Sequence, residues 1–325
     1  MSFFQTCMLA TALALVLERG LGYADWLVPR FGHPVVWIGN LISRLEARFN
    51  AQDQSDAQRR RMGLVMLAIV LLVVGLIAGG LMLALRTLTY GWVLEALLAT
   101  SLFCQKELGQ RVEQVAKGLE TDLQSGRDAV AHLVGRDTKA LDEAEVSKAA
   151  IESLAENTSD GIIAPAFWMV IGGLPGAALY KAINTCDSMV GYRNARYEAF
   201  GLASAKLDDL VNLVPARLTG FLFTLAMFSV SPTRAARAWT IMWRDARKHA
   251  SPNAGWPEAA MAGALDISLG GPRKYEGRVT KLAHMGDGDQ PLTPGTVRKA
   301  LVLYRLMLAL FAALIGGPAL VWILI

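Results

Sequence analysis

The stretch from Glu152 to Arg217 decides how this chain is interpreted. It opens with Glu152-Ser-Leu-Ala-Glu156-Asn157-Thr-Ser-Asp160-Gly161-Ile-Ile-Ala-Pro165. It continues with Lys181-Ala-Ile-Asn184-Thr-Cys-Asp187-Ser-Met-Val-Gly191-Tyr192-Arg193-Asn194 and closes with Lys206-Leu-Asp208-Asp209-Leu-Val-Asn212-Leu-Val-Pro215-Ala-Arg217. Carboxylates, amides and cations alternate with segments apolar enough to enter a membrane. Ionisable groups at membrane depth are costly and by default mark function.

Composition places the chain among membrane proteins. Hydrophobic residues make up 53% of it and charged residues only 18%, which is typical of that class. A net charge of +4 is too small and too dispersed to indicate a nucleic-acid partner. The 3 cysteines form no CxxC pair, which argues against a disulfide scaffold or a structural zinc site. The apolar run Phe3–Leu17 lacks a charged n-region and a cleavage site, so we interpret it as a retained first span.

The predicted fold is an all-α polytopic membrane protein, a single integral-membrane domain over residues 1–325 with about five to six membrane segments. These segments are predicted at approximately 3–20, 64–85, 87–104, 162–183, 210–230 and 301–325, and the polar, site-bearing loops at 18–63, 105–161, 184–210 and 231–300. The segment 162–183 is interrupted by Gly172-Gly-Leu-Pro-Gly176, which predicts a discontinuous or re-entrant helix.

Cation counts predict the orientation in the membrane. The regions 18–63, 105–161 and 231–300 hold 25 of the 32 lysines and arginines, so they should face the cytoplasm. Six crossings would then place both termini outside, together with the region 184–210. The break at Gly172–Gly176 leaves a second arrangement open, in which the polar residues of 184–210 line a cavity that opens to the cytoplasm.

Three carboxylates precede the broken segment. Glu152, Glu156 and Asp160 are spaced i, i+4, i+8, so on a continuous helix they share one face. Carboxylates that converge on a cavity suit a hard cation such as Mg²⁺, which keeps water and bridges substrate phosphates. The alternative is a solvated acidic helix face that ends in a polar C-cap.

The next polar residues repeat helical spacing. Asn184 and Asp187 lie at i, i+3, and Asp208 with Asn212 at i, i+4. An ion pair of Lys206 with Asp209 is the alternative interpretation, contributing about 0.3–0.5 kcal/mol if exposed. Against it, Asp208 and Asp209 are adjacent like charges at the mouth of a span, and such a pair requires a cation or a proton.

Two clusters could bind anions. Arg193 and Arg196 lie between two tyrosines, and arginine forks bind phosphate or carboxylate; a positive-inside membrane anchor is the alternative. The loop His249–Ala260 leads into a helix whose first N–H groups could bind an anion. The alternative is that these residues only form the turn before the helix. His33 and His249 have no partners at metal-ligand spacing, which favours structural roles. The chain has no GxxxxGK[ST] loop, no GxGxxG after a strand, no GxSxG and no HExxH motif.

Together these motifs resemble one family. The chain is similar to the integral-membrane amide synthases of cobalamin biosynthesis, the CbiB/CobD family of adenosylcobinamide or adenosylcobinamide-phosphate synthases. The resemblance rests on His33-Pro-Val with Trp37-Ile-Gly, Val134-Gly-Arg136-Asp-Thr138, Glu156-Asn157 through Asp160-Gly161 to Ala164-Pro165, Asn184-Thr to Tyr192, Leu207-Asp-Asp209 with Pro215-Ala-Arg217, Ser251 to Gly255 with Glu258, and Leu269-Gly-Gly-Pro272. Two positions depart from the family pattern: Glu18 replaces an expected Asp, and Arg273-Lys274 replace an expected Asn.

The resemblance implies an ATP- and Mg²⁺-dependent amide ligation in the cell inner membrane, with the site facing the cytoplasm. Adenosylcobyric acid would be joined to (R)-1-amino-2-propanol or its O-phosphate, giving adenosylcobinamide or its phosphate. Other implied partners are membrane lipid and further membrane enzymes of cobalamin assembly, with no nucleic acid.

The resemblance also assigns roles to residues as hypotheses. Catalytic roles fall to Asp160, Asp187, Asp208, Asp209 and Arg193. Metal binding falls to Glu156, Asp160, Asp187, Asp208 and Asp209. Substrate binding falls to His33, Arg136, Asn157, Lys181, Asn184, Arg196, Arg217, Ser251, Asn253 and Glu258.

Two other classes of function remain open. One is a non-enzymatic regulatory membrane protein of the related β-lactamase-induction type, which we expect to lack several of these motifs. The other is a corrinoid-binding transporter, for which broken helices with buried acidic groups are typical. No inverted repeat is visible in the sequence, and the long polar region 231–300 suits a catalytic site better.

Overall fold

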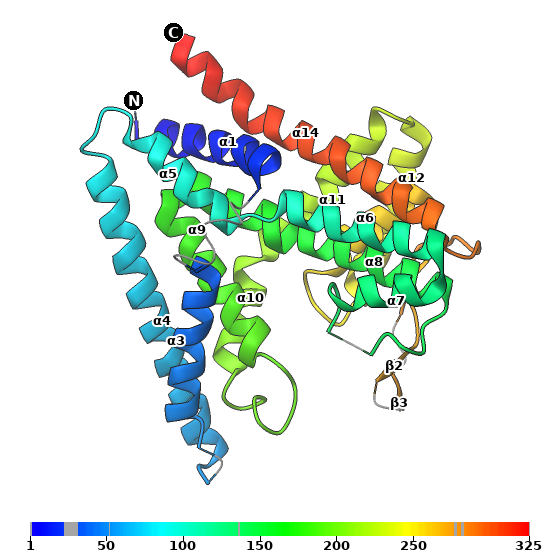
Figure 1. The fold of residues 1–325 in the computed structure, drawn as a ribbon, viewed down its shortest axis with the longest axis horizontal. Coiled ribbons are helices and arrows are strands. Elements are labelled where there is room, and N and C mark those ends of the chain that lie inside the picture. The colour runs from blue at the N-terminus through cyan, green and yellow to red at the C-terminus, as the bar shows by residue number, and fades with distance from the viewer. Residues whose placement is uncertain are drawn as a thin grey trace. The chain divides into compact units, whose positions relative to one another are not determined.

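The structure is a computed structural model that describes residues 2–22, 32–51, 53–135, 137–275, 278–280 and 283–324. Over these residues the chain is almost wholly α-helical, with two short antiparallel strand pairs (Figure 1). It forms two compact units. Unit 1 comprises Met1–Cys104, Ala164–Asn212 and Ile315–Ile325, and unit 2 comprises Gln105–Ile163 and Leu213–Leu314. The single membrane domain expected over 1–325 stays a prediction.

Unit 1 is built from helices that pack around α9. Its elements are α1 (Phe3–Leu21), α3 (Pro34–Phe49), α4 (Asp56–Leu85), α5 (Gly91–Ala99), the 3₁₀ turn η1 (Thr100–Leu102), α9 (Ala164–Val190), α10 (Leu202–Val211) and the end of α14 (Pro294–Leu324). Helices α1, α3, α4, α5 and α10 all contact α9. Small and branched side chains such as Ala10, Val70 and Ala182 are fully buried there, which allows close helix packing.

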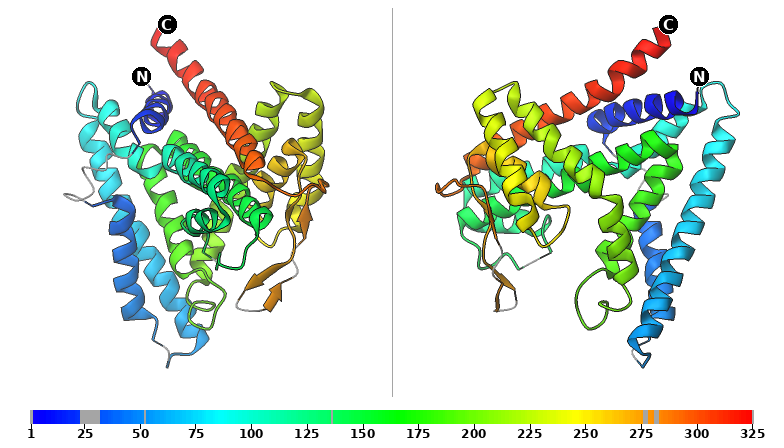
Figure 2. Two further views of the ribbon diagram at one scale, coloured as in Figure 1. Left: turned by 45° about the vertical axis from the view of Figure 1, so that its right-hand side comes forward. Right: turned by 180° about the vertical axis from the view of Figure 1, so that it is seen from behind.

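Unit 2 has helix α13 at its centre. Its elements are α6 (Gln105–Thr121), α7 (Leu123–Ala131), α8 (Glu143–Thr158), the π-turn η2 (Ser159–Ile163), α11 (Leu213–Phe228), α12 (Pro232–Asp245), the 3₁₀ turn η3 (Ala246–Lys248), α13 (Gly255–Leu265), β1 (Leu269–Gly270), β2 (Arg273–Tyr275), β3 (Arg278–Thr280), β4 (His284–Met285) and most of α14. Every residue from 255 to 264 is buried, because α13 packs against α8, α11 and α12. Strand β1 pairs with β4 and β2 with β3, and the β2–β3 pair projects from the helices of this unit (Figure 2).

The protein is an all-α polytopic membrane protein, as predicted. Four helices in the described part of the chain are long and apolar enough to cross a membrane: Phe3–Leu21, Asp56–Leu85, Glu143–Val190 and Pro294–Ala319. The number rises to five if α10 and α11 form one bent span. The predicted segment 64–85 falls inside α4, and the described part of the predicted segment 301–325 falls inside α14.

One predicted span is shorter in the structure. The segment 87–104 was expected to cross the membrane, but α5 has 9 residues and ends in the turn η1. At about 1.5 Å per residue it covers about 14 Å, less than half of a hydrocarbon core of about 30 Å. Its Glu95 is fully buried against Arg86, so this segment packs against protein.

The predicted break in 162–183 is confirmed. Gly173 has φ 62° and ψ −154°, a region that is essentially restricted to glycine. Pro175 follows and cannot supply an N–H group to the helix. The helix resumes and continues to Val190, beyond the predicted end at residue 183.

In the sequence, Asp142 with Glu145 has the pattern of an N-cap and its capping partner, which predicts a helix that runs to about Asp160 and stops at Gly161. The helix starts as predicted. The Asp142 carboxylate accepts the Glu145 backbone N–H at 2.8 Å, and the Glu145 side chain accepts the Asp142 N–H at 3.0 Å, which completes a capping box. The predicted stop at Gly161 is wrong: the chain passes through the π-turn Ser159–Ile163 straight into α9. A π-turn keeps the backbone hydrogen-bonded, so glycine does not terminate the helix here.

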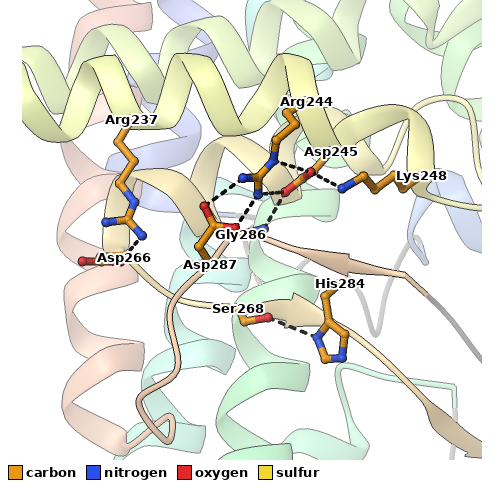
Figure 3. A network of polar contacts seen from close by, with 9 residues as sticks. All are labelled: Arg237, Arg244, Asp245, Lys248, Asp266, Ser268, His284, Gly286 and Asp287. Carbon is orange, nitrogen blue, oxygen red and sulfur yellow. Dashed lines mark hydrogen bonds and ion pairs between the residues drawn. The ribbon is translucent and has the colours of Figure 1, made fainter.

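An ionic network fastens the β4 segment to α12 (Figure 3). The buried Asp245 carboxylate accepts hydrogen bonds from Arg244 at 2.6 Å, from Lys248 at 2.6 Å and from the Gly286 backbone N–H at 2.9 Å. Arg244 also pairs with Asp287 at 2.7 Å. Burial alone would raise the pKa of Asp245, but the hydrogen bonds from Arg244, Lys248 and the Gly286 N–H, together with the charge of Arg244, outweigh it and hold that pKa below its usual range.

Candidate functional site

A polar cluster in unit 1 joins the second half of α9 to α10. Asp208 is buried, with 8% of its surface exposed. Its two carboxylate oxygens accept hydrogen bonds from Asn184 Nδ2 at 3.3 Å and from Asn212 Nδ2 at 3.0 Å. The Tyr180 hydroxyl donates to Asn212 Oδ1 at 2.9 Å. A buried carboxylate held by two amides is fixed in position, as a binding site requires.

Two further carboxylates belong to this cluster. Asp187 lies one helical turn beyond Asn184 on α9, close enough to Asp208 and Asp209 for their charges to repel. Asp209 in turn experiences the attraction of Arg193 and Lys206. The structure therefore brings together the predicted residues Asn184, Asp187, Asp208, Asp209 and Arg193. Tyr180 and Asn212 complete the cluster although they were not assigned roles from the sequence; the spacing Tyr180, Asn184, Asp187 (i, i+4, i+7) is the signal that could have identified the first.

The donor chemistry of this cluster fits Mg²⁺. Carboxylate and amide oxygens are the hard ligands that this ion takes, and it commonly uses one or two carboxylates together with substrate phosphates. Within the described parts of the chain, no three His, Cys, Asp or Glu side chains form a group that could hold a metal by themselves. An ion at Asp187, Asp208 and Asp209 would thus need oxygens from the substrate or from water.

Gly191 lies against the cluster because its backbone turns back on Asp187. Its N–H donates to the Asp187 carbonyl at 2.7 Å, and a Cβ at this position would come within 1.9 Å of Asp187 Oδ1. A methyl group there must displace the carboxylate. A misplacement of about 1 Å can lower turnover about 10²-fold.

We therefore expect Gly191→Ala to lower the turnover number about 10²-fold. Some loss of thermal stability should accompany it, because the same Cβ lies 2.7 Å from the Asp187 backbone oxygen, which must also shift. Steady-state kinetics and thermal unfolding of the detergent-solubilised protein would measure the two effects. Gly79→Ala is the matched control, since a Cβ at Gly79 meets nothing within 4 Å. Equal activity of the two variants would show that the position of Asp187 does not matter.

The loop that carries Arg193 and Arg196 is held by α3 and α4. Arg196 forms a two-pronged ion pair with Glu46, at 3.1 Å from Nε and 3.0 Å from Nη2. Asn50 donates to Glu46 at 2.9 Å, and Arg59 donates to Asn50 and to the backbone of this loop. Arg193 is exposed, whereas a substrate anion at Arg196 would have to compete with Glu46. Lys181 is partly exposed on α9.

The acidic residues before the membrane segment lie in unit 2 and differ in environment. Glu152 is buried and accepts the Gly270 backbone N–H at 2.7 Å, so it ties α8 to β1. Glu156 is exposed, and Asp160 is partly exposed within the π-turn. Such turns are frequent at functional sites.

A second group of predicted residues gathers at the start of α13. The Ser251 hydroxyl accepts the N–H groups of Asn253 at 3.2 Å and Ala254 at 3.3 Å. His249 Nε2 lies 3.8 Å from Glu258 Oε1. Arg217 on α11 stacks over the Trp256 ring at 4.5 Å. Ser251, Asn253, Glu258 and Arg217 thus share one region of unit 2.

The remaining predicted residues are placed as follows. Asn157 donates its side-chain amide to the Ser153 carbonyl at 2.9 Å within α8. His33 caps α3, accepting the Val35 N–H at 3.2 Å on its Nδ1 atom, in line with a structural role. Arg136 lies outside the described residues. Of the two departures noted in the sequence, Glu18 is buried on α1, and Arg273 and Lys274 form β2.

A family model described as CobD/Cbib protein matches residues 11–304. The chain belongs to the CobD/Cbib protein family. This match covers both groups of candidate residues, and it confirms the resemblance drawn from the motifs.

Several relatives from the CobD/Cbib family align with this chain over almost the whole length of both proteins. "Cobalamin biosynthesis protein CobD" of Rhodobacter capsulatus is 48% identical over 311 residues, covering 95% of this chain and 96% of the relative. Proteins of the same name are 44% identical in Brucella suis, over 97% of both chains, and 42% identical in Halalkalibacterium halodurans, over 95% of this chain and 97% of the relative. No solved structure matches this chain.

Proposed function

We propose that this protein is an ATP-dependent amide ligase of cobalamin biosynthesis. It joins a propionate of adenosylcobyric acid to (R)-1-amino-2-propanol or its O-phosphate and forms adenosylcobinamide or its phosphate. Membership in a family whose curated members are named cobalamin biosynthesis proteins supports the pathway. The observation that carries the reaction type is the unit 1 cluster, in which Asp187, Asp208 and Asp209 gather beside Arg193.

The chemistry requires activation of a carboxylate. A carboxylate oxygen of the corrin attacks the γ-phosphorus of ATP, the bond to ADP breaks, and an acyl phosphate forms. The amine then attacks the acyl carbon, loses a proton, and releases inorganic phosphate. Phosphoryl transfer depends mainly on positioning and on stabilising charge at phosphate oxygens.

The chain's residues can take these roles. Mg²⁺, when bound, would supply charge stabilisation at the phosphates. Asp187, Asp208 and Asp209 would hold it, with Asn184 and Asn212 keeping Asp208 in place. Arg193 is exposed beside Asp209 and can contact a phosphate oxygen. For unit 2, taken by itself, we propose metal binding by Glu156 and Asp160 and substrate binding by Asn157, Ser251, Asn253, Glu258 and Arg217.

Location follows from the same proposal. ATP is a cytoplasmic substrate, so the site faces the cytoplasm from the inner membrane, in keeping with the cation-rich regions 18–63, 105–161 and 231–300. We also propose that lipid and other membrane enzymes of cobalamin assembly are its neighbours.

The direct test is an activity assay on the detergent-purified full chain. It contains adenosylcobyric acid and MgATP with either aminopropanol or aminopropanol phosphate, and the corrin product is followed by mass spectrometry. A mass gain that matches an amide with one amine, dependent on ATP and abolished by chelation of Mg²⁺, is the expected result and identifies the acceptor. Corrin binding without product from either amine would contradict the ligase and favour a binding or transport role.

A further inference from the structure

A buried ion pair in unit 1 lies at the break in α9, away from the polar cluster that contains Asp187, Asp208 and Asp209 (the carboxylate cluster). Glu95 on α5 is fully buried. Arg86, which follows the last residue of α4, reaches it with Nε at 3.2 Å from Oε2 and Nη2 at 3.3 Å from Oε1. Ionisable groups inside a membrane helix bundle are costly and are retained for a purpose.

The Glu95 carboxylate also holds the broken helix directly. Its Oε1 atom accepts the backbone N–H of Leu174 at 2.9 Å, immediately after the break at Gly173. A Cβ at Gly173 would lie 2.8 Å from the same oxygen, so the carboxylate fills the space that glycine leaves. Glu95 therefore caps the start of the half-helix Leu174–Val190, where an anion is favoured by the free N–H groups.

Arg86 extends the contact to the first helix. Its Nη2 atom lies 3.1 Å from Cys7 Sγ, and its guanidinium lies 4.6 Å from the centre of the Phe3 ring. Helices α1, α4 and α5 thus converge on the point where α9 restarts, and all three contact one another or α9 (Figure 1). Contacts from these three helices therefore fix the position at which the half-helix begins.

The same half-helix carries three members of the carboxylate cluster. Tyr180, Asn184 and Asp187 follow Leu174 on α9, and Asp187 lies about 20 Å along the helix axis from it at about 1.5 Å per residue. A helix is stiff, so a tilt of about 3° at the break displaces Asp187 by about 1 Å over that length. A displacement of this size is enough to impair a reaction that depends on alignment.

We infer that Glu95, held by Arg86, is a positioning residue that fixes the half-helix Leu174–Val190 and thereby the Asn184–Asp187 side of the cluster. Its effect on catalysis rests on the proposed function, whereas its effect on the half-helix does not. The two parts are tested by separate measurements on the same variants.

The structural measurement is hydrogen–deuterium exchange, read by mass spectrometry on the full chain in detergent. In Glu95→Gln the amide can still accept the Leu174 N–H, but Arg86 loses its counter-charge. We expect amide exchange in the first turns after Leu174 to become about 10- to 100-fold faster, with α12 and α13 unchanged. Arg86→Lys keeps a cation but loses the two-pronged contact, so exchange of the same amides should become faster by a smaller factor. This variant is the replacement test if Glu95→Gln does not fold.

The kinetic measurement uses the ligase assay. Glu95→Gln should lower kcat about 10-fold or more, while KM for the amine stays within about twofold, because alignment is lost and not amine binding. The double variant Glu95→Gln with Arg86→Gln restores a neutral hydrogen-bonded pair and should recover part of kcat. Glu120→Gln is the matched control: Glu120 forms an exposed pair with Arg298 at 2.7 Å in unit 2, and its loss should leave exchange and kinetics unchanged.

The outcomes separate the two ideas. Unchanged exchange after Leu174 in both single variants, or faster exchange spread evenly over both units, would overturn the positioning role whatever the activity. A wild-type protein that makes no amide would overturn the proposed function, and the exchange result would still decide whether Glu95 fixes the half-helix.

Discussion

Asp208→Asn is expected to lower kcat for amide formation about 10²- to 10³-fold while the protein remains folded, and Asp187→Asn to do the same. Both substitutions keep the shape of the side chain and remove one negative charge from the cluster. If these carboxylates hold a cation against the phosphates of ATP, the charge is what the reaction uses. The measurements are product formation by mass spectrometry and thermal unfolding in detergent.

The hydrogen bonds of Asp208 make the structural cost of its substitution small. Asn184 and Asn212 both donate to the carboxylate, at 3.3 and 3.0 Å. An asparagine at 208 offers one oxygen and one NH₂ group, so one of the two donors must turn away. The cost of losing one such hydrogen bond to a buried carboxylate is about 1.5–3 kcal/mol, which is less than the usual stability of a folded protein.

A control substitution tests whether removing a carboxylate outside the cluster has the same effect on activity. Asp289 is an exposed carboxylate in unit 2, and Asp289→Asn should keep full activity and stability. Full activity in both Asp187→Asn and Asp208→Asn would remove these carboxylates from the mechanism. Loss of activity that follows a large drop in unfolding temperature would instead indicate a structural role.

Much of the fold could be predicted because the strongest signals are local. The charge-free run within α4 predicts a membrane helix on composition alone. Asp142 and Glu145 predict a helix start through hydrogen bonds that the two residues make with each other. Pro175 and its neighbouring glycines predict the break in α9 through backbone geometry.

Other elements depend on contacts that the sequence does not show. The segment around Glu95 is as apolar as a span, but its length is set by the turn at Thr100 and by the pairing of Glu95 with Arg86, 9 residues earlier. Gly161 predicts a helix stop, whereas packing of the π-turn against α8 and α11 keeps the chain helical. Tertiary packing overrides local preference in both cases.

The candidate site shows the same division. The spacing of Asn184 with Asp187 predicted a shared face on one helix, and the structure places them so. The contact of Asn184 with Asp208 joins residues 24 positions apart, and the contact of Tyr180 with Asn212 joins residues 32 apart. Helical spacing carries no information on such pairs, so neither contact could be predicted from the sequence.

Asp245→Asn is expected to lower the free energy of unfolding by about 2–4 kcal/mol at neutral pH. The Asp245 side chain is fully buried, whereas its partners Arg244 and Lys248 are 44% and 48% exposed. These cations can regain water when the carboxylate is neutralised, which keeps the loss below that of a fully buried pair. Denaturant unfolding of the detergent-solubilised protein would measure it.

The contribution of Asp245 should also depend on pH in a defined direction. Its pKa in the folded protein is held below the ordinary value of about 3.9. The stabilisation is therefore fully present above about pH 4 and is lost as the pH falls below that value toward the folded pKa. Between about pH 4 and pH 2 the wild-type protein should lose stability more steeply than Asp245→Asn, which lacks this titrating group.

Asp287→Asn is the control for the network, since Asp287 contacts the same Arg244 but is 51% exposed. Exposed ion pairs contribute about 0–1 kcal/mol, so this variant should resemble the wild-type protein at neutral pH. If Asp245→Asn were as stable as Asp287→Asn, the hydrogen bonds that Asp245 accepts from Lys248 and Gly286 would make no measurable contribution to the free energy of unfolding. A clear difference between the two would show that burial of the carboxylate, and not the presence of Arg244, makes this network stabilise the attachment of β4 to α12 in unit 2.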